Sequence, residues 1–367
     1  MRATPLCARS LLLLLGIATC LLVSTGSTAG AQGVAGGLSR IGHIVVIYEE
    51  NHSFDNLYGT FPGANGLSGA PAITQVNRDG SPMSALAMLN TTTKKPDEKI
   101  PGNLPPVPFT YNAYYQPDQK TGDMIHAFYT EQVQIDGGKM DKFAAWSDSH
   151  GQPFNYFTTY AAGQARTDHL KDESDFLAAL TSGTVPAVAY IKPIGADNEH
   201  PGYATISQGE QHAVDLIKAI QASPIWNDTV VIVTYDEHGG SFDHVPPPTP
   251  ATDGARADRW GPGVRVPTIV ISPFARQHFV DHTPYDTTSI LKLIEERFGL
   301  APLGTRDAAV NDLTGSLTLT GAAPLPGTGS GGQAGATPAG RPWQLLALAV
   351  LLSVVGALSA LRARRMA

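Results

Sequence analysis

The sequence predicts an α/β fold with a central, mostly parallel sheet between helices. Four short apolar runs predict its buried strands, because each is nearly continuous and rich in β-branched residues. Helical patterns alternate with these runs, as expected of strands joined by crossover helices. The four runs are His43–Tyr48, Val185–Ile191, Thr229–Tyr235 and Pro267–Ile271.

Two segments carry the clearest helical pattern. Apolar residues recur every three or four positions in Gln208–Ala222 and again in Thr287–Phe298, which predicts two amphipathic helices. Residues 60–120 are rich in Pro and Gly and have weak periodicity. We expect them to form a long surface excursion, part of it near the active face.

Composition restricts the classes of function. The chain has 367 residues, enough for one large core or at most two domains. Its net charge is -7 and it has no basic stripe, so we do not expect nucleic acid as a partner. A phosphorylated substrate stays compatible with this charge, because a local metal ion can outweigh the overall sign.

The N-terminus has the features of an export signal. Two arginines flank the start of an apolar run over residues 11–23, and Ala29-Gly30-Ala31 offers a small-residue cleavage site. We expect residues 1–31 to be a signal peptide, with an uncleaved membrane anchor as the alternative. Both cysteines lie within it, so the mature protein would have neither a disulfide nor thiolate chemistry.

The C-terminus predicts an anchor. Residues 343–361 carry no charge and are long enough to span a bilayer, and the Arg-rich tail 362–367 is predicted to be cytoplasmic. The motif LPGTG at 325–329, in a Gly/Ala/Pro/Thr-rich linker over 311–342, matches the LPxTG signal of sortases. We therefore expect a folded body over 38–310 on the extracellular face, held by the membrane or the cell wall. A simple membrane tail is the alternative to sortase processing.

Acidic residues crowd the ends of two predicted strands. Glu49-Glu50-Asn51 follows the first, and Asp236-Glu237-His238 follows the third, with His244 a little further on. Ligands of α/β sheets bind beyond the carboxyl ends of the strands. Neighbouring carboxylates repel each other there unless a cation neutralises them. The two clusters together predict a divalent metal ion, whereas either cluster alone is equally well a solvated acidic loop.

Four further histidines are harder to assign from pattern. His200 follows the exit of the second strand and should join the same face, although a structural role is the alternative. His282 precedes a helix, where capping and catalysis are both open. His150 has no pattern that places it, and the same holds for His126.

Several motifs together resemble the bacterial phosphoesterase family of acid phosphatases and non-haemolytic phospholipases C, in the alkaline phosphatase superfamily. The resemblance covers roughly residues 40–60, 123–145 and 152–307, and it implies an alkaline phosphatase-like layered fold and a metal-dependent hydrolase of phosphate esters. The motifs are HIVVIYEENHSFDNLYG, GGKMDKF, QPFNYF, EHPGYA, VTYDEHGGSFDHVPPP, RWGPGVRVPTIVISPFA and DHTPYDTTSILKLIEERF.

The resemblance also implies roles for individual residues. Phosphate oxygens or the leaving group would be assisted by His126 and His200, with Asn51 as the third catalytic residue. EHPGYA and YDEHGG are closer to the acid phosphatase branch, which favours a small phosphate monoester over a phospholipid. The implied metal ligands are Glu50, Asn51, Asp236 and Glu237.

One departure from the family concerns the nucleophile. The family has a longer stretch with a Ser or Thr nucleophile between the regions of GGKMDKF and QPFNYF, whereas here residues 145–151 run directly into Gln152. No residue matches the nucleophile, and Ser147 and Ser149 are nearest the junction. Three explanations stay open: an incomplete or mis-joined gene product, a shortened enzyme with a substitute nucleophile, or a non-catalytic relative that binds metal and phosphate. Loss of a covalent nucleophile costs about a million-fold in a well-studied protease, so full activity is not expected.

A sulfatase or phosphomutase on the same fold is a weaker alternative. Sulfatases depend on a modified Cys or Ser, and the mature chain would have no cysteine.

Overall fold

The computed structural model describes residues 37–86, 89–90, 95–124, 126–144, 169–258 and 260–319. They all belong to the first of two units of the chain, Met1–Pro324, and the second unit is Leu325–Ala367. The predicted signal peptide, the LPGTG motif, the apolar segment 343–361 and His150 lie outside the described residues.

A four-stranded sheet with the order β4-β1-β5-β6 forms the centre of the described body. The strand β1 (His43–Glu49) pairs in parallel with β4 (Val188–Ile191) and β5 (Thr229–Tyr235). The edge strand β6 (Thr268–Ile271) pairs antiparallel with β5. All four predicted strands are present, and the prediction of a mostly parallel sheet is confirmed.

The edge strand β6 is the antiparallel member of this mostly parallel sheet. A parallel neighbour of β5 needs a long crossover, usually a helix. Between β5 and β6 the described chain has only the four-residue helix α7 (Pro250–Asp253) and the 3-10 turn Gly254–Arg256. The chain therefore returns along β5 in the opposite direction.

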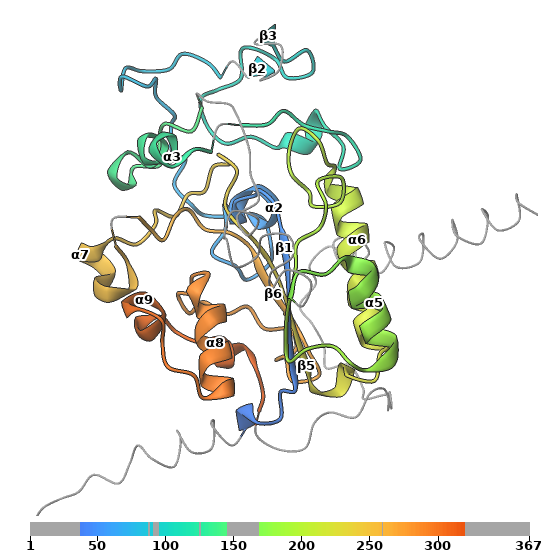
Figure 1. The fold of residues 1–367 in the computed structure, drawn as a ribbon. Coiled ribbons are helices and arrows are strands. Elements are labelled where there is room, and N and C mark those ends of the chain that lie inside the picture. Colours follow the sequence, from blue (N-terminus) through green and yellow to red (C-terminus); the bar gives the residue numbers. More distant parts are fainter. Residues whose placement is uncertain are drawn as a thin grey trace, which may run out of the picture. The chain divides into compact units, whose positions relative to one another are not determined.

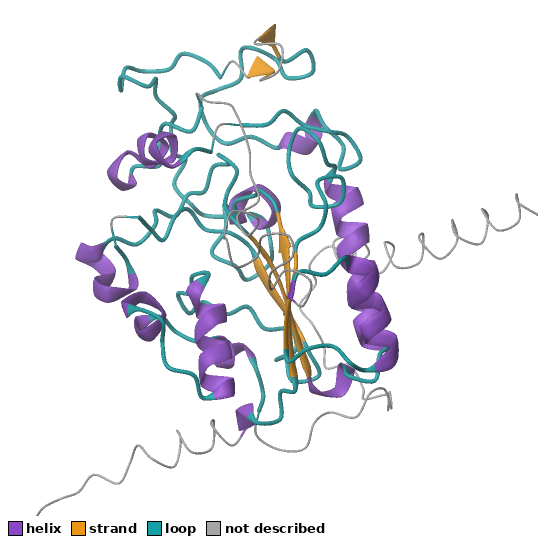
Figure 2. Cartoon of the chain, viewed as in Figure 1, coloured by secondary structure: helices purple, strands orange, loops and turns teal. Residues whose placement is uncertain are grey.

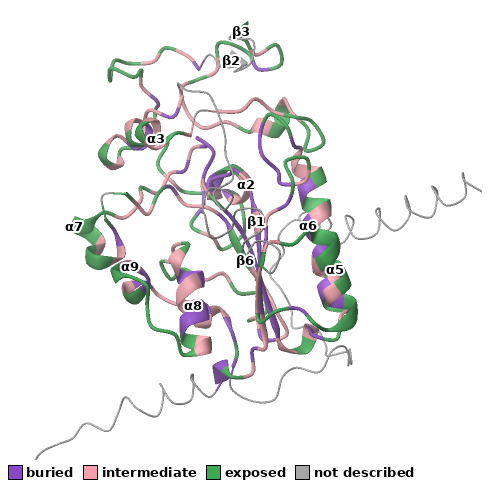
Figure 3. Ribbon diagram, in the orientation of Figure 1, coloured by how far each residue is buried: buried purple, intermediate pink, exposed green. Residues whose placement is uncertain are grey.

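Helices cover both faces of the sheet (Figure 1). Ile44 and Ile232 point to the face that packs against α8 (Thr288–Phe298). Val45 and Val231 point to the other face, which α5 (Glu173–Ser182) and α6 (Ile206–Ala222) cover. Figures 2 and 3 show the buried strands between these helical layers. In β1 and β5, burial on both faces explains why the sequences are nearly continuous apolar runs.

The two predicted helices are α6 and α8. In α6, the Thr205 side chain accepts a hydrogen bond from the Gln208 N–H and caps the first turn. In α8, Gly299 ends the helix in the left-handed conformation, with φ +66°. The remaining described helices had no predicted counterpart: α2 (Phe54–Tyr58), α3 (Phe128–Ile135), α5, α7 and α9 (Thr305–Ala309).

The excursion over 60–120 is mostly loop, as predicted, and its strands are the short antiparallel pair β2 (Leu89–Asn90) and β3 (Lys95–Pro96) (Figure 2). The other short elements are the 3-10 turns Tyr111–Ala113, Asp136–Gly138, Trp226–Asp228 and Leu313–Ser316.

The folded body extends further than the predicted boundary at residue 310. Leu313, Leu317 and Leu319 are buried in the same core cluster as the α8 side chains, and the Leu319 carbonyl accepts a hydrogen bond from the Arg40 guanidinium at 3.0 Å. The start of the predicted linker is therefore part of the core. No helix within the described ranges has the length and apolar character that a membrane crossing requires.

We expect Ile232→Ala to lower the free energy of unfolding by about 2–5 kcal/mol, because it leaves a cavity in the central strand, where Ile232 is 0% exposed. Ile269→Ala on the edge strand, where the side chain is 39% exposed, should cost less than about 1 kcal/mol. Urea unfolding followed by circular dichroism measures both, and equal losses would contradict this account of the core.

Candidate functional site

The parallel pairing of β1 with β5 brings the two acidic clusters together. Glu49 lies opposite Tyr235 in the register, and the Asp236 N–H donates to the Glu49 carbonyl at 3.2 Å. Glu50 and Asp236 thus leave neighbouring strands at the same edge of the sheet. This is the edge at which ligands of α/β sheets bind.

Lys192 lies between these two carboxylates. Its Nζ is 2.5 Å from Glu50 Oε1 and 2.9 Å from Asp236 Oδ2. Glu50 and Asp236 are therefore close enough to share one cation. The sequence reasoning missed Lys192, although it directly follows β4, and the rule that selected the ends of β1 and β5 applies to β4 as well.

The second oxygen of Glu50 faces His200 and Tyr203. Glu50 Oε2 accepts a hydrogen bond from the Tyr203 hydroxyl at 3.1 Å and lies 4.0 Å from His200 Nε2. The His200 ring stacks on the Tyr203 ring with centroids 4.1 Å apart. Because His200 Nδ1 donates to the Pro201 carbonyl at 2.6 Å, Nε2 is the nitrogen that faces Glu50.

Asn51 contacts His126, which comes from the segment before α3. Asn51 Nδ2 lies 3.3 Å from His126 Nε2, and His126 Nδ1 donates to the Met124 carbonyl at 2.6 Å. The Asn51 Oδ1 atom is buried and has no hydrogen-bond partner among the described residues. An amide oxygen in that state is available to a cation.

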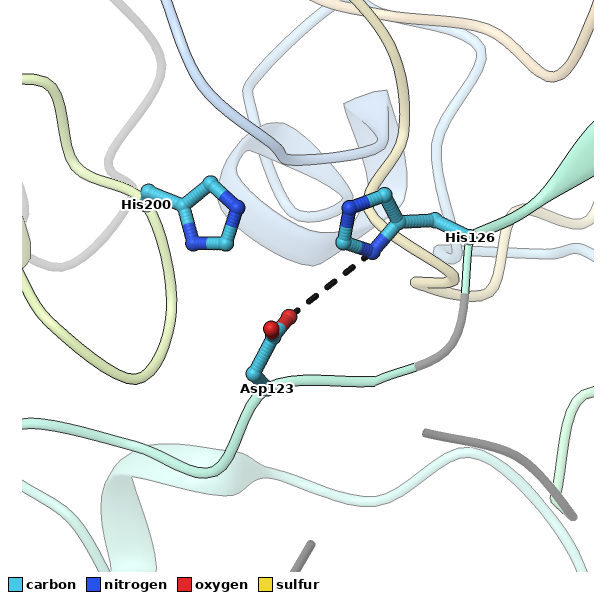
Figure 4. Close-up of side chains that lie close together, drawn as sticks. All are labelled: Asp123, His126 and His200. Atoms are coloured by element: carbon cyan, nitrogen blue, oxygen red, sulfur yellow. Dashed lines mark ion pairs between the residues drawn. The ribbon is translucent and has the colours of Figure 1, made fainter. Parts of the chain in front are cut away.

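Figure 4 shows how Asp123, His126 and His200 lie together. The two imidazole rings approach edge to face with centroids 5.6 Å apart. Asp123 Oδ1 is 3.7 Å from His126 Nδ1. The resemblance assigned both histidines to the site, whereas Asp123 was not predicted.

Glu237 lies between His126 and the backbone that follows β5. Its Oε1 is 3.6 Å from His126 Nε2, and its Oε2 accepts the Gly239 N–H at 2.8 Å. Gly239 has φ +63°, and a Cβ there would lie 2.2 Å from the Asn51 carbonyl oxygen. Only glycine allows this close approach between the β1 and β5 exits.

Several carboxyl groups here have raised pKa values, so they stay protonated to a higher pH than usual. Burial, as the main cause, raises the pKa of Glu237 to about 8 and also raises the pKa of Asp236. Deeper in the fold, burial and the charge of Glu199 raise the pKa of Glu49 to about 9, and neither Glu49 carboxylate oxygen has a hydrogen-bond partner in the described structure. Burial raises the pKa of Glu199 to about 8. A bound divalent cation would lower the pKa of the carboxyl groups that bind it.

The residues present fit a divalent metal ion. Glu50 and Asp236 offer carboxylate oxygens that meet at Lys192, and Asn51 offers its unpartnered amide oxygen. Glu237, the fourth predicted ligand, groups with Glu131 and His238 among the described residues. Such oxygen donors suit hard or borderline divalent ions. The repulsion between carboxylates is at present offset by the Lys192 ammonium, which shows that a positive charge is accommodated between them.

His244 belongs to a separate network. Its Nδ1 is 2.6 Å from Asp55 Oδ2, and Arg265 bonds both Asp55 and Asp243 at 3.0–3.2 Å. The guanidinium already pairs with these two buried carboxylates, and the imidazole contacts Asp55. This network joins α2, which follows β1, to the loop that follows β5, and the candidate role of His244 stays a prediction.

His282 is exposed in the loop before α8. Thr287 is the N-cap residue of α8, so the capping role considered for His282 is wrong. Its catalytic role stays untested. His282 also lies outside the three groups of ligand-type side chains found in the described residues, which are Asp123–His126–His200, Asp55–Asp243–His244 and Glu131–Glu237–His238.

Comparison with known proteins identifies a family. The model of the phosphoesterase family matches residues 41–166 and 160–301 of this chain. Phospholipase C B of Mycobacterium tuberculosis is 38% identical over 166 residues, which are 40% of this chain and 32% of that protein. The non-hemolytic phospholipase C of Burkholderia pseudomallei is 32% identical over 190 residues, 44% of this chain and 26% of that protein.

A plant protein shows the same similarity. The non-specific phospholipase C6 of Arabidopsis thaliana is 32% identical over 152 residues, 34% of this chain and 29% of that protein. The chain thus spans about a third or less of the length of each of these relatives.

We expect Lys192→Met to destabilise the protein in the presence of a chelator by about 1–3 kcal/mol, because two partly buried carboxylates lose their shared counter-charge. Millimolar Mg²⁺ or Mn²⁺ should restore the loss. Lys218→Met is the matched control, since Lys218 pairs with Asp215 at 4.0 Å on the exposed surface of α6. Thermal unfolding measures these effects, and a variant that divalent ions leave unimproved would argue against the shared cation site.

Stability in the presence of a chelator should fall as pH rises. Glu49, Glu199 and Glu237 have folded-state pKa values of about 9, 8 and 8, above the ordinary value of 4.5. The native state therefore holds more protons than the unfolded state between about pH 4.5 and 9, and stability declines across that window. Glu49→Gln should flatten the decline, whereas Glu98→Gln on the surface should not. Melting temperatures from pH 5 to 9 test this, and an unchanged slope in Glu49→Gln would refute it.

Proposed function

The chain belongs to the phosphoesterase family, and we propose that it hydrolyses phosphate esters with the help of a bound divalent metal ion. The observation that carries this proposal is the position of Glu50 and Asp236. They come from the exits of two parallel strands, and both lie within 2.9 Å of one ammonium nitrogen. A site that concentrates carboxylates around one cation at this edge of the sheet is suited to holding a metal and an anionic substrate.

The residues that would hold the metal are Glu50, Asn51, Asp236 and Glu237. When bound, the metal supplies a positive charge that polarises the phosphoryl group and offsets the charge of its oxygens. Glu50 and Asn51 are adjacent in the chain, as are Asp236 and Glu237, so two short turns present the four side chains. Gly239 keeps these turns in contact through its close approach to Asn51.

The two histidines have a different role in the proposal. His126 and His200 each hold Nδ1 against a backbone carbonyl and direct Nε2 toward the acidic residues. A proton on Nε2 would let each ring donate a hydrogen bond to a phosphate oxygen and pass that proton to the leaving oxygen. Lys192 adds a positive charge that attracts an anionic substrate to the same place.

For the substrate we propose a small phosphate monoester. The motifs EHPGYA and YDEHGG, which contain His200, Tyr203 and Glu237, support this choice. The relatives reported above are named phospholipases C, which supports a phosphodiesterase as the second candidate. A monoester and a diester with the same leaving group distinguish the two.

A non-catalytic surface protein that binds metal and phosphate is the rival from another class. Its support is the unmatched nucleophile and the fraction of the relatives that the chain spans. Ser147 and Ser149, the side chains nearest the junction, lie outside the described residues.

We place the protein on the extracellular face. The apolar N-terminal segment, the LPGTG motif at 325–329 and the uncharged run 343–361 with its Arg-rich tail support export, a membrane anchor and processing by a sortase.

We expect the purified chain to release p-nitrophenol from p-nitrophenyl phosphate only when a divalent ion is present. Asp236→Asn should lower kcat/KM by about 100-fold or more, because a metal ligand contributes several kcal/mol to transition-state stabilisation. Asp215→Asn on the exposed face of α6 is the matched control and should keep the wild-type rate.

The outcomes separate the candidates. Faster turnover of bis-p-nitrophenyl phosphate than of the monoester would favour a phosphodiesterase. If wild-type protein and Asp236→Asn release product equally slowly while the wild type still binds the metal, the binding protein is the correct reading.

A further inference from the structure

A second cluster of metal-ligand side chains lies beside the site described above. Glu131 of α3, Glu237 and His238 each place one ligand atom within 4.8 Å of the others. Two of the three follow β5 directly, and the third comes from a helix about a hundred residues earlier in the chain. The proposed function uses Glu237 alone among them.

His238 has the orientation of a metal ligand. Its side chain is 2% exposed, and Nδ1 donates to the Ser241 carbonyl at 3.1 Å. That hydrogen bond makes Nδ1 a donor, so Nε2 is the ring nitrogen open to a proton or a metal ion. Nε2 is buried, lacks a hydrogen-bond partner among the described residues, and faces Glu131. A lone pair directed at a carboxylate is unfavourable unless a proton or a cation lies between them.

The spacing decides between a proton and a metal ion. His238 Nε2 is 3.5 Å from Glu131 Oε1, whereas charge-assisted N–H···O hydrogen bonds are about 2.7–2.9 Å long. Two ligands at about 2.1 Å from a tetrahedral ion are about 3.4 Å apart. The observed separation therefore suits an ion between the two atoms better than a shared proton.

The surroundings keep the ligands in place. The Phe143 ring meets the His238 ring edge to face at 6.0 Å, and the Phe143 N–H donates to Gln75 Oε1 at 2.9 Å. Glu237 Oε2 is held by the Gly239 N–H. The imidazole is thus fixed by packing on one side and by a backbone hydrogen bond on the other, as expected of a supported ligand.

We propose that Glu131, Glu237 and His238 bind a second divalent cation of borderline character, with Zn²⁺ as the best fit. One imidazole and two carboxylates offer nitrogen and oxygen donors of the types that zinc binds, with the remaining position left to water. Glu237 is common to this site and to the oxygen-rich site around Glu50 and Asp236. The proposal does not depend on hydrolytic activity, because its test counts bound metal.

The test uses the full chain, stripped with a chelator and then titrated with Zn²⁺ by calorimetry, with bound metal counted by mass spectrometry. Wild-type protein should bind two equivalents. Glu131→Gln and Asp236→Asn should each bind one, losing different sites, and the double variant should lose at least about 100-fold in affinity at both. Glu173→Gln is the matched control, because Glu173 pairs with His212 at 2.7 Å in a histidine–carboxylate pair outside the three ligand groups.

The result that would overturn the proposal is one equivalent in the wild type, or two equivalents retained in Glu131→Gln. In either case His238 is an imidazolium in an ion pair. His238→Gln is a second variant that should behave like Glu131→Gln, with circular dichroism showing that each variant is folded. If turnover fails while two equivalents are bound, the proposed function fails and the second site stands; if Asp236→Asn keeps two equivalents, the ligand set of the first site is wrong.

Discussion

The pairing of β1 with β5 is the constraint on which the rest of the site depends. Seven residue pairs run in parallel register from His43–Thr229 to Glu49–Tyr235, and both strands are buried between two helical layers. A slip of one residue would exchange the faces of every side chain, so the register is strongly specified by the core. The alignment of Glu50 with Asp236 is therefore a consequence of hydrophobic packing, although neither residue is hydrophobic.

Charge at the end of this sheet is balanced at short range. Lys192 reaches the Glu50–Asp236 pair, and Arg265 reaches Asp55 in α2 and Asp243 in the loop after β5. The two arrangements differ in kind. An arginine in two-pronged contact with buried carboxylates makes a permanent structural pair, whereas a single lysine on a flexible stem is readily replaced by a metal ion.

The strands and the meeting of their acidic ends could be predicted from the sequence, because continuous apolar runs and the carboxyl-end rule are local signals. The direction of β6 could not, since it depends on how the chain returns after β5, where the described residues have only the short helix α7. Lys192 followed the same rule as the acidic residues, yet a single lysine after a strand carries no distinctive pattern. Glu131 lies on α3, a short helix with a weak apolar pattern, and only the fold brings it to His238.

Arg265 lies later in the chain than both loops that it joins. It donates to Asp55 and Asp243 and also to the Asn65 carbonyl, so the turn after β1 gains its counter-charge only when a segment about two hundred residues downstream has been made. During synthesis, the acidic segment after β1 therefore emerges from the ribosome well before Arg265. The segments after β1 and β5 reach their final arrangement only when Arg265, just before β6, has been made. A polypeptide interrupted before that point would keep the acidic residues without the arginine that joins the two segments.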